Sequence, residues 1–448
     1  MKKSVKKRYY FDHAATTPLD KRVLKKMMPF LTSEFGNPSN LYEMGRKAGQ
    51  AVAEATETIT DILNCRPDEF VFTGSATEAD NLAILGVARA HTKRVPLFNS
   101  ESKGAPFFGR IIVSQIEHKG ILAVCDVLRK DGFDVVELPV LKNGLVDLEV
   151  LKKSLTPETI LVSITSADSE TGTIQPIAEI AKIIRNWKIE NSLKIKNFKL
   201  KIDGSLPCLH TDASQAAGYV DIDLGKLPVD LMTLSAHKLG GPKGIGGLYI
   251  RHGVNIEPII YGGGQQGKLR SGTENVPGIV GFAEAIRLNN FHRGDTSVKI
   301  KKMRDELEKG IFKLIHKVVL NGHPAKRLPN FLNVSILDVE GEAMLLYLDA
   351  LGIMVSTGSA CNSQSLEPSK VLTALGNPYE FVHGSLRFTL GKENKMSDIK
   401  YVLKHLPAVV KKLRAMSPLD LKLGQTAKIS NQKAFVGNQI PHFVRKSH

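Results

Sequence analysis

Alternation between short apolar runs and longer helical patterns is the feature that most constrains the fold of this chain. The runs predicted as strands, each rich in β-branched or aromatic residues, are 70–73, 110–115, 134–140, 159–165, 208–214, 230–236 and 246–251. The helical patterns that separate most of them are about 77–91, 120–132, 147–155 and 177–189. Such alternation predicts an α/β fold with a mostly parallel, seven-stranded sheet covered by helices.

A second region with a different pattern follows this one. Its predicted elements are two helices, at 281–290 and 297–316, then strands at 330–337, 352–357 and 384–391 and a closing amphipathic helix at 398–416. We therefore expect a smaller α+β domain beside the large one. The predicted division is a large domain of 16–295 with insertions near 93–109 and 188–207, a small domain of 1–15 and 296–418, and a basic, flexible tail of 419–448.

Composition excludes several classes of protein. No apolar run approaches the ~20 residues of a membrane span, and the basic start of the chain lacks the apolar stretch of a secretory signal, so we expect a cytoplasmic protein without a membrane partner. The four cysteines match no zinc spacing, and no metal site is expected. The net charge of +16 comes largely from clusters that lack a nucleic-acid motif. We expect solvated basic segments rather than a nucleic-acid partner.

The stretch LSAHKLGGPKGIGG at 234–247 places Lys238 beside many glycines, and three interpretations compete for it. A surface turn would use the glycines for chain reversal. A phosphate loop would need Ser or Thr after the lysine, where Leu239 stands, or a glycine where Tyr249 stands. In the third interpretation Lys238 forms a Schiff base with a carbonyl cofactor.

Groups at the ends of other predicted strands favour the third interpretation. Ser75 and Glu78 have capping-box spacing after a strand, which predicts a helix N-terminus that suits an anion such as phosphate. His118 and Asp212 also lie at strand ends, and a buried carboxylate needs a partner such as a protonated ring nitrogen. Because the carboxyl ends of parallel strands share one edge of the sheet, these groups meet Lys238 there. Together they are the parts that pyridoxal 5'-phosphate (PLP) requires.

A second reactive centre is predicted in VSTGSACNSQSLEPS, at 355–369. Cys361 lies there among small and polar residues, a composition typical of a mobile loop rather than of a core. A thiol on such a tether suits a nucleophile that travels to its target. The other cysteines, Cys65, Cys125 and Cys208, lack this setting.

In these motifs the chain resembles the first group of NifS/IscS-type cysteine desulfurases, which belong to the class V aminotransferase family of fold-type I PLP enzymes. The resemblance runs from about Tyr10 to about Leu413. The motifs that carry it, in order, are YFDHAATTP, FGNPSNLYEMGRKA, FTGSATEADNLAI, EHKGIL, TDASQAAG, SAHKLGGPKGIGGLYI, GGGQQGKLRSGTEN and STGSACNSQSLEPS.

The resemblance implies roles for particular residues. Lys238 would form the Schiff base and move protons at the substrate Cα, His118 would stack on the pyridine ring and act in acid–base steps, and Cys361 would attack the substrate sulfur. Asp212 would pair with the ring nitrogen, and Gln215 would lie near the phenolic oxygen. The residues implied to hold the phosphate are Ala76, Thr77, Ser235, His237 and, from the second subunit of a homodimer, Thr273. Those implied to bind the substrate are Arg387, which would grip its carboxylate, and Asn37 nearby.

The implied activity is that of a PLP-dependent cysteine desulfurase, a sulfurtransferase. L-cysteine would give L-alanine and a persulfide on Cys361. The persulfide would pass to a sulfur acceptor protein, either an iron–sulfur scaffold or a tRNA-thiolation enzyme. Cys361 is also a candidate for transient ligation of an iron–sulfur cluster.

The chain departs from the family at one informative place. Where the family usually has Asn-Asn in NNETG, this chain has Asp168 and Ser169 in SADSETGTIQPI. The second asparagine normally hydrogen-bonds the phenolic oxygen of PLP, which the shorter Ser169 would reach only through water. The Asp168 side chain would add negative charge close by. A smaller departure is Asn40-Leu-Tyr42, where the family often has Ser and His.

Other functions remain as alternatives. One is a related PLP lyase acting on selenocysteine or cystine, which need not depend on Cys361. Another is a divergent, non-catalytic paralogue, against which the retention of Lys238, Asp212, Arg387 and Cys361 argues. A last one is RNA binding through the basic ends, which would weaken steeply with salt.

Overall fold

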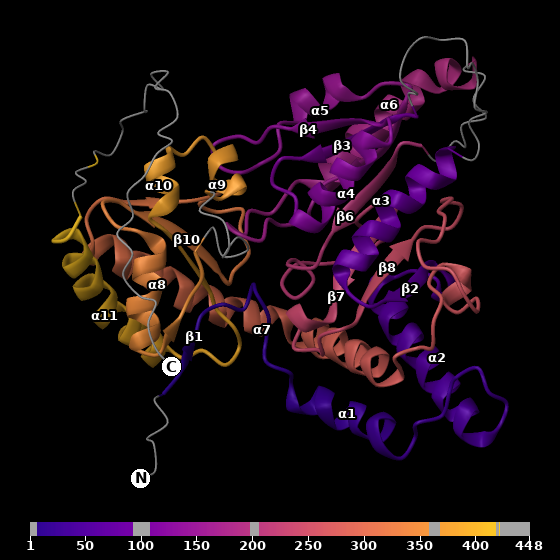
Figure 1. Ribbon diagram of the computed structural model, residues 1–448, viewed down its shortest axis with the longest axis horizontal. Coiled ribbons are helices and arrows are strands. Elements are labelled where there is room, and N and C mark those ends of the chain that lie inside the picture. Colours follow the sequence, from indigo (N-terminus) through magenta and orange to yellow (C-terminus); the bar gives the residue numbers. More distant parts are fainter. Residues whose placement is uncertain (1–6, 93–107, 198–205, 358–367, 418–420, 422–448) are drawn as a thin grey trace, which may run out of the picture.

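The molecule has two lobes that are joined by one long helix (Figure 1). The structure is a computed structural model, and it describes residues 7–92, 108–197, 206–357, 368–417 and 421. The larger lobe holds a seven-stranded sheet, and the smaller lobe holds a three-stranded sheet.

The large sheet confirms the predicted α/β architecture. Its strands are β2 (Phe70–Thr73), β3 (Arg110–Ser114), β4 (Asp134–Leu138), β5 (Thr159–Ser163), β6 (Cys208–Asp212), β7 (Leu231–Ser235) and β8 (Gly246–Ile250). They are arranged in the order β2-β8-β7-β6-β5-β3-β4, and only β8 runs antiparallel to its neighbours. Strands β2, β3, β5, β6 and β7 therefore end at the same edge of the sheet.

Helices cover both faces of this sheet. They are α1 (Lys21–Thr32), α2 (Glu43–Leu63), α3 (Ala76–Thr92), α4 (Lys119–Lys130), α5 (Leu148–Ser154) and α6 (Ile177–Asn197), with short 3₁₀ turns η1 (Pro67–Glu69), η2 (Ala236–Lys238) and η3 (Gln266–Lys268). Ile111 and Val113 pack with α3 and α4, whereas Ile112 packs in the core on the other face. Successive side chains of a strand point to opposite faces, so a strand buried on both sides is a continuous apolar run.

The small lobe has its own core. Its strands are β1 (Tyr9–Tyr10), β9 (Val318–Leu320), β10 (Phe331–Ile336), β11 (Ile353–Met354) and β12 (Ser385–Thr389), and its helices are α8 (Gly341–Ala350), α9 (Lys370–Ala374), α10 (Tyr379–His383) and α11 (Met396–Arg414). Strands β12, β10 and β9 form an antiparallel sheet, and β1 pairs with β11 in parallel. The three-residue β9 was not predicted, because so short a run carries no periodicity.

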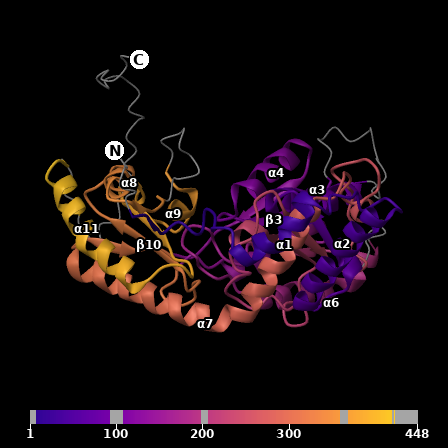
Figure 2. The ribbon, with the colours of Figure 1, turned by 90° about the horizontal axis from the view of Figure 1, so that it is seen from below.

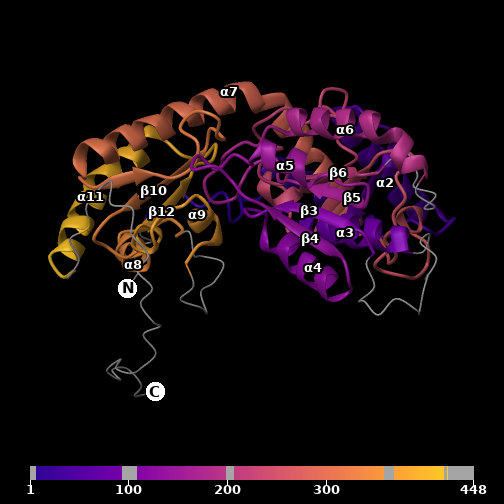
Figure 3. The ribbon, with the colours of Figure 1, turned by 90° about the horizontal axis from the view of Figure 1, so that it is seen from above.

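One continuous helix replaces the two helices that the sequence predicted between the lobes. Helix α7 (Val276–Leu314) runs from the large lobe to the small one (Figures 2 and 3). Gly294 lies inside the helix and is exposed. A glycine there costs only about 1 kcal/mol relative to alanine, which packing at both ends of the helix offsets.

The predicted boundary at 295/296 falls within α7. Buried residues of α7 up to Leu288 join cores of the large lobe, and those from Ile300 onward join the core of the small lobe, which also includes Phe11. The domain bounds themselves stay a prediction. No helix in the described residues is both long and apolar enough to cross a membrane. The cytoplasmic location stays a prediction.

Candidate active site

A cavity of about 230 Å³ opens at the edge of the large sheet where the parallel strands end. The segments that follow β2, β3, β5, β6 and β7 all contribute to its wall. Its lining residues are Ser75, Ala76, Thr77, Asp80, Ile116, His118, Thr165, Ala167, Ser169, Asp212, Ser214, Gln215, Ser235, His237 and Lys238. All residues predicted to contact a cofactor, except Thr273, therefore lie together; their roles stay predictions.

The start of α3 forms one side of the cavity. The Glu78 backbone N–H donates to Ser75 Oγ at 3.1 Å, as the capping-box spacing predicted. The Glu78 carboxylate, however, accepts from the Gly74 N–H at 2.9 Å and pairs with Arg270. The first-turn N–H groups at Ala76 and Thr77 have no partner within the helix, so this turn favours an anion.

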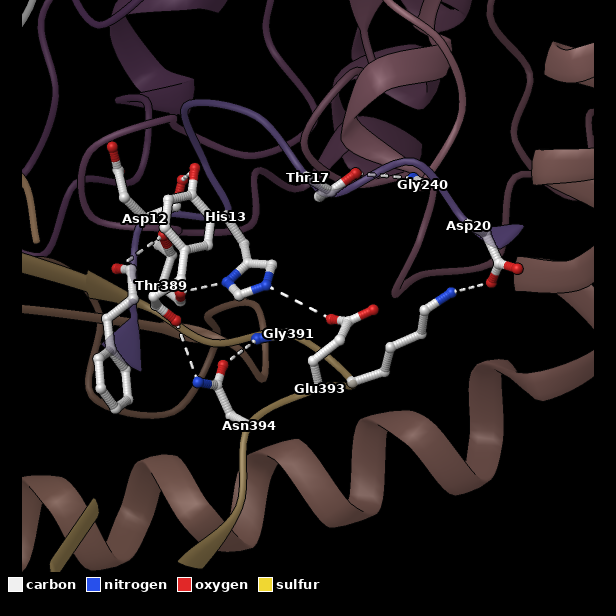
Figure 4. A network of polar contacts seen from close by, with 12 residues as sticks. Asp12, His13, Thr17, Asp20, Gly240, Thr389, Gly391, Glu393 and Asn394 are labelled. Atoms are coloured by element: carbon white, nitrogen blue, oxygen red, sulfur yellow. Dashed lines mark hydrogen bonds and ion pairs between the residues drawn. The ribbon is translucent and has the colours of Figure 1, made fainter. Parts of the chain in front are cut away.

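Lys238 is held by the N-terminal segment of the chain. Its Nζ donates to the carbonyl oxygens of Ala14 and Ala15, the latter at 2.8 Å. In the same segment, Thr17 Oγ1 accepts a hydrogen bond from the Gly240 N–H at 2.8 Å (Figure 4). These contacts join positions more than two hundred residues apart, and the sequence analysis missed them. The solvated-turn interpretation of 234–247 is wrong, because Lys238 lies on the cavity wall.

Contacts with the small lobe fix this N-terminal segment in place (Figure 4). The His13 ring bonds the Thr389 carbonyl oxygen through Nδ1 at 2.9 Å, and its Nε2 lies 3.5 Å from the Glu393 carboxylate. A Cβ atom on Gly391 would come within 2.1 Å of the same ring, so only glycine fits beside it. The segment that binds Lys238 is therefore held in place by contacts with the end of β12 and the residues that follow it.

The His118 ring has a defined orientation. His118 caps α4, and its Nδ1 accepts from the Gly120 N–H at 3.1 Å. A neutral ring with Nδ1 as acceptor carries its proton on Nε2. Burial among protein atoms lowers the pKa of His118, an effect that Lys238 and Lys119 increase and Asp212 opposes. The ring is thus held neutral at the cavity.

Other polar groups of the cavity are also fixed by short contacts. Asp212 accepts the Ser214 N–H at 2.8 Å, and Gln215 Nε2 donates to the Ala14 carbonyl at 3.0 Å. His237 Nδ1 lies 3.1 Å from Thr16 Oγ1. Burial and the nearby Lys238 lower the pKa of His237 to about 4, so this ring is a neutral hydrogen-bonding group.

Arg387 lies behind Ser169, at the border between the lobes. Its Nη1 donates to the Ser169 carbonyl at 2.7 Å, and its Nη2 donates to the Asp12 carboxylate at 2.8 Å. The side chain is 10% exposed, and its Nε has no hydrogen-bond partner in the described chain. A guanidinium has five N–H donors, so several, including that of Nε, are still available to grip a carboxylate.

Asp168 does not point into the cavity. Its carboxylate accepts the backbone N–H groups of Glu170 and Thr171 and the Thr171 hydroxyl, so it shapes the turn after β5. Burial raises its pKa. In the same turn the Glu170 carboxyl accepts a hydrogen bond from the hydroxyl of Ser369, the residue that caps the start of α9. The Asp168 carboxylate, which the sequence predicted to lie close to a cofactor, therefore bonds to groups of the turn itself.

Some predicted site residues are not part of the cavity. Arg387 does not line it, although it contacts Ser169, which does; Thr273 and Asn37 are exposed and do not line it, and Cys361 lies outside the described residues. Among the cysteines that are described, burial raises the pKa of Cys65 and Cys125 to about 12, which makes both poor nucleophiles. Cys208 is buried in β6.

Comparison with known proteins identifies what the chain is similar to. The family model described as aminotransferase class-V matches residues 9–402. A cysteine desulfurase IscS from Methanosarcina thermophila is 46% identical over 93% of this chain and 95% of its own length. A solved NifS-like protein is 35% identical with a TM-score of 0.79, over 91% of this chain and all of that one. A structure described as SspA in complex with cysteine is 32% identical with a TM-score of 0.70, over 86% of this chain and all of that one.

Proposed function

This chain belongs to the aminotransferase class-V family, and from that premise we propose that it is a PLP-dependent cysteine desulfurase. The observation that carries the proposal is the convergence of Lys238, His118, Asp212 and the first turn of α3 on one cavity. Relatives described as cysteine desulfurases, at 40–46% identity over at least nine tenths of the chain, support it.

The residues of the cavity fit the cofactor. The first turn of α3, with Ser235 and His237, offers donors to a phosphate. Asp212 offers a carboxylate to a protonated ring nitrogen, and Lys238 an amine to an aldehyde. When bound, PLP supplies that aldehyde and a ring that withdraws electrons from the substrate Cα.

Each remaining residue then has a task toward the substrate. Arg387 binds the carboxylate of L-cysteine through the donors that Asp12 and Ser169 leave available. Lys238 takes the proton from Cα and returns protons later, and the neutral His118, held by its contact with Gly120, donates or accepts a proton at the cavity.

Cys361 is the proposed sulfur acceptor within the enzyme. The Cys361 thiolate forms a bond to the sulfur of L-cysteine while the Cβ–S bond breaks. The electron pair of that bond stays with the carbon, which takes up a proton, so L-alanine leaves and a persulfide remains on Cys361. The described residues on either side of the segment support this placement. Ser356 pairs with Arg387 through both backbone hydrogen bonds, and Ser369 donates to Glu170 beside Ser169.

We further propose that the enzyme is a homodimer and passes its persulfide to an acceptor protein, an iron–sulfur scaffold or a tRNA-thiolation enzyme. Thr273 is exposed and away from the cavity of its own chain, as a residue that contacts a partner's cofactor would be. The apolar side chains on α1 and the loop after it offer a surface for the second subunit.

The deciding experiment measures alanine and persulfide from L-cysteine in the purified protein with PLP, together with its visible absorption. We expect Lys238→Ala to lose the absorption and to slow turnover by at least about 100-fold, because both the amine and the proton transfer are gone. We expect Cys361→Ala to keep the absorption and to form neither persulfide nor alanine.

Cys65→Ala is the matched control, because it removes a thiol whose pKa burial raises to about 12, and it should behave as the wild type does. Full turnover of selenocysteine or cystine by Cys361→Ala would favour the related lyase instead. Cofactor absorption in the wild type without any turnover would favour the non-catalytic paralogue.

A further inference from the structure

A buried acid forms part of the cavity floor, and none of the roles above uses it. Asp80 lies on α3, one turn beyond the anion-binding first turn, and is 1% exposed. It lines the cavity, yet neither carboxyl oxygen makes a hydrogen bond of good geometry to any described residue. Burying an unpartnered carboxyl group costs free energy, so its retention on a cavity wall calls for a functional reason.

The basic side chain that lies against Asp80 is that of His210, and it does not supply a positive charge. His210, two residues before Asp212 on the same face of β6, places Nε2 3.7 Å from Asp80 Oδ1. The His210 ring bonds Ser163 Oγ at 2.8 Å and Thr233 Oγ1 at 3.1 Å, and burial lowers its pKa to about 4. The ring is therefore neutral.

Three carboxyl groups are concentrated here. Burial raises the pKa of Asp80 well above its usual value, and the charges of Asp212 and Glu117 add to this, against the nearby Thr233 hydroxyl. Burial also raises the pKa of Glu117 to about 8, although Ser114 and the Thr165 N–H hydrogen-bond its carboxyl. His118, His237 and Lys238 line the same cavity as Asp80 and Asp212. Close carboxylates in a buried site repel, and protonation relieves the repulsion.

We propose that Asp80 is a positioning residue for the cofactor: as a neutral acid it presents a polar O–H to the cavity and leaves Asp212 as the one carboxylate beside the ring nitrogen. One negative charge then matches the one positive charge of a protonated ring. Asp80 acts through Asp212 and does not itself react. The inference rests on the proposed function, since it assumes that PLP occupies this cavity.

The test compares Asp80→Asn with Asp80→Leu by PLP affinity and by the melting temperature of the cofactor-free protein. Asn is neutral and polar, as the protonated acid is, so it should keep the affinity within about twofold. Leu removes the polar group and should weaken PLP binding by about tenfold. Because Leu also removes the unpartnered buried acid, it should raise the melting temperature of the cofactor-free protein.

Glu117→Leu is the matched control, since Glu117 is buried but does not line the cavity. It should lower the melting temperature, because the Thr165 N–H loses its acceptor, and leave PLP affinity unchanged. An infrared difference spectrum between wild type and Asp80→Asn should show the C=O stretch of a protonated acid in the wild type.

Several results would overturn the inference. Equal PLP affinity in wild type and Asp80→Leu would remove any role toward the cofactor. A loss of affinity in Asp80→Asn, or an ionised carboxylate in the infrared spectrum, would show that Asp80 carries a charge. A wild type that bound no PLP would overturn both the proposed function and this inference. A wild type that bound PLP as tightly as Asp80→Leu does would overturn this inference alone.

Discussion

Arg387 illustrates how a single residue is prepared for binding before any substrate arrives. Its guanidinium is nearly buried and is already oriented by Asp12 and by the Ser169 carbonyl. Such a planar group binds a carboxylate through two parallel hydrogen bonds, which the point charge of a lysine cannot reproduce.

At this scale we predict that Arg387→Lys raises the KM for L-cysteine by about tenfold and changes kcat less, because the charge remains while the bidentate geometry is lost. Steady-state kinetics with L-cysteine measures both values. The control is Arg110→Lys, since Arg110 pairs with Asp134 and begins β3, at the edge of the sheet opposite the cavity. An unchanged KM in Arg387→Lys would contradict the assigned role.

Elements of the two lobes are joined at the turn after β5. Glu170 accepts the hydroxyl of Ser369, and Ser369 also caps α9 by accepting the Leu372 N–H at 3.0 Å. Burial raises the pKa of Glu170 to about 8, from an ordinary value of 4.5. Between these values the folded protein holds a proton that the unfolded chain has released, so stability falls as the pH rises through this range.

At the scale of elements we therefore predict that Glu170→Gln flattens the dependence of melting temperature on pH. The wild type should lose more stability than the variant between pH 5 and pH 8, because glutamine does not titrate. Thermal unfolding of both proteins in matched buffers measures the difference. Glu117 changes stability with pH in the same direction, but it is present in both proteins, so its contribution cancels when the two curves are compared. Parallel curves would show that Glu170 is ionised in the folded protein.

The whole molecule exposes an apolar surface on the large lobe, and in the proposed homodimer a second copy covers it. Helix α1 buries Val23 and Met27 and exposes a second row of apolar side chains, at Leu24, Met28 and Leu31. The following loop adds Phe35 at 73% exposure and Leu41 at 88% exposure. Contiguous exposed apolar side chains are typical of protein–protein contacts.

At this largest scale we predict that Leu41→Asp weakens the dimer by at least about tenfold, or about 1.4 kcal/mol, because a charge would enter an apolar contact. Sedimentation equilibrium measures it. Leu346→Asp, which changes a 68% exposed residue on α8 in the other lobe, should leave the dimer intact. If Thr273 serves the partner's site, Leu41→Asp should also weaken PLP binding; a monomer with full PLP affinity would contradict that role.

The sequence by itself determined the strands of the large sheet, the helices between most of them and the groups that follow each strand. Apolar runs and capping residues act over a few positions, so β2, β6 and β7 and the placement of Ser75, Asp212 and Lys238 at their ends could be predicted. Parallel strands that end at one edge then bring those groups together, which is why the sequence could predict that most of them lie near one another; their roles stay predictions.

Only the tertiary structure decided which distant groups meet. The carbonyls of Ala14 and Ala15 bind Lys238, and His13 packs on Gly391. Asp80 is buried and makes no hydrogen bond of good geometry to any residue that the structure describes. Nothing local marks these residues, because their contacts depend on how the lobes pack. The continuity of α7 has the same origin: cores at both of its ends stabilise a helix whose middle carries an exposed glycine.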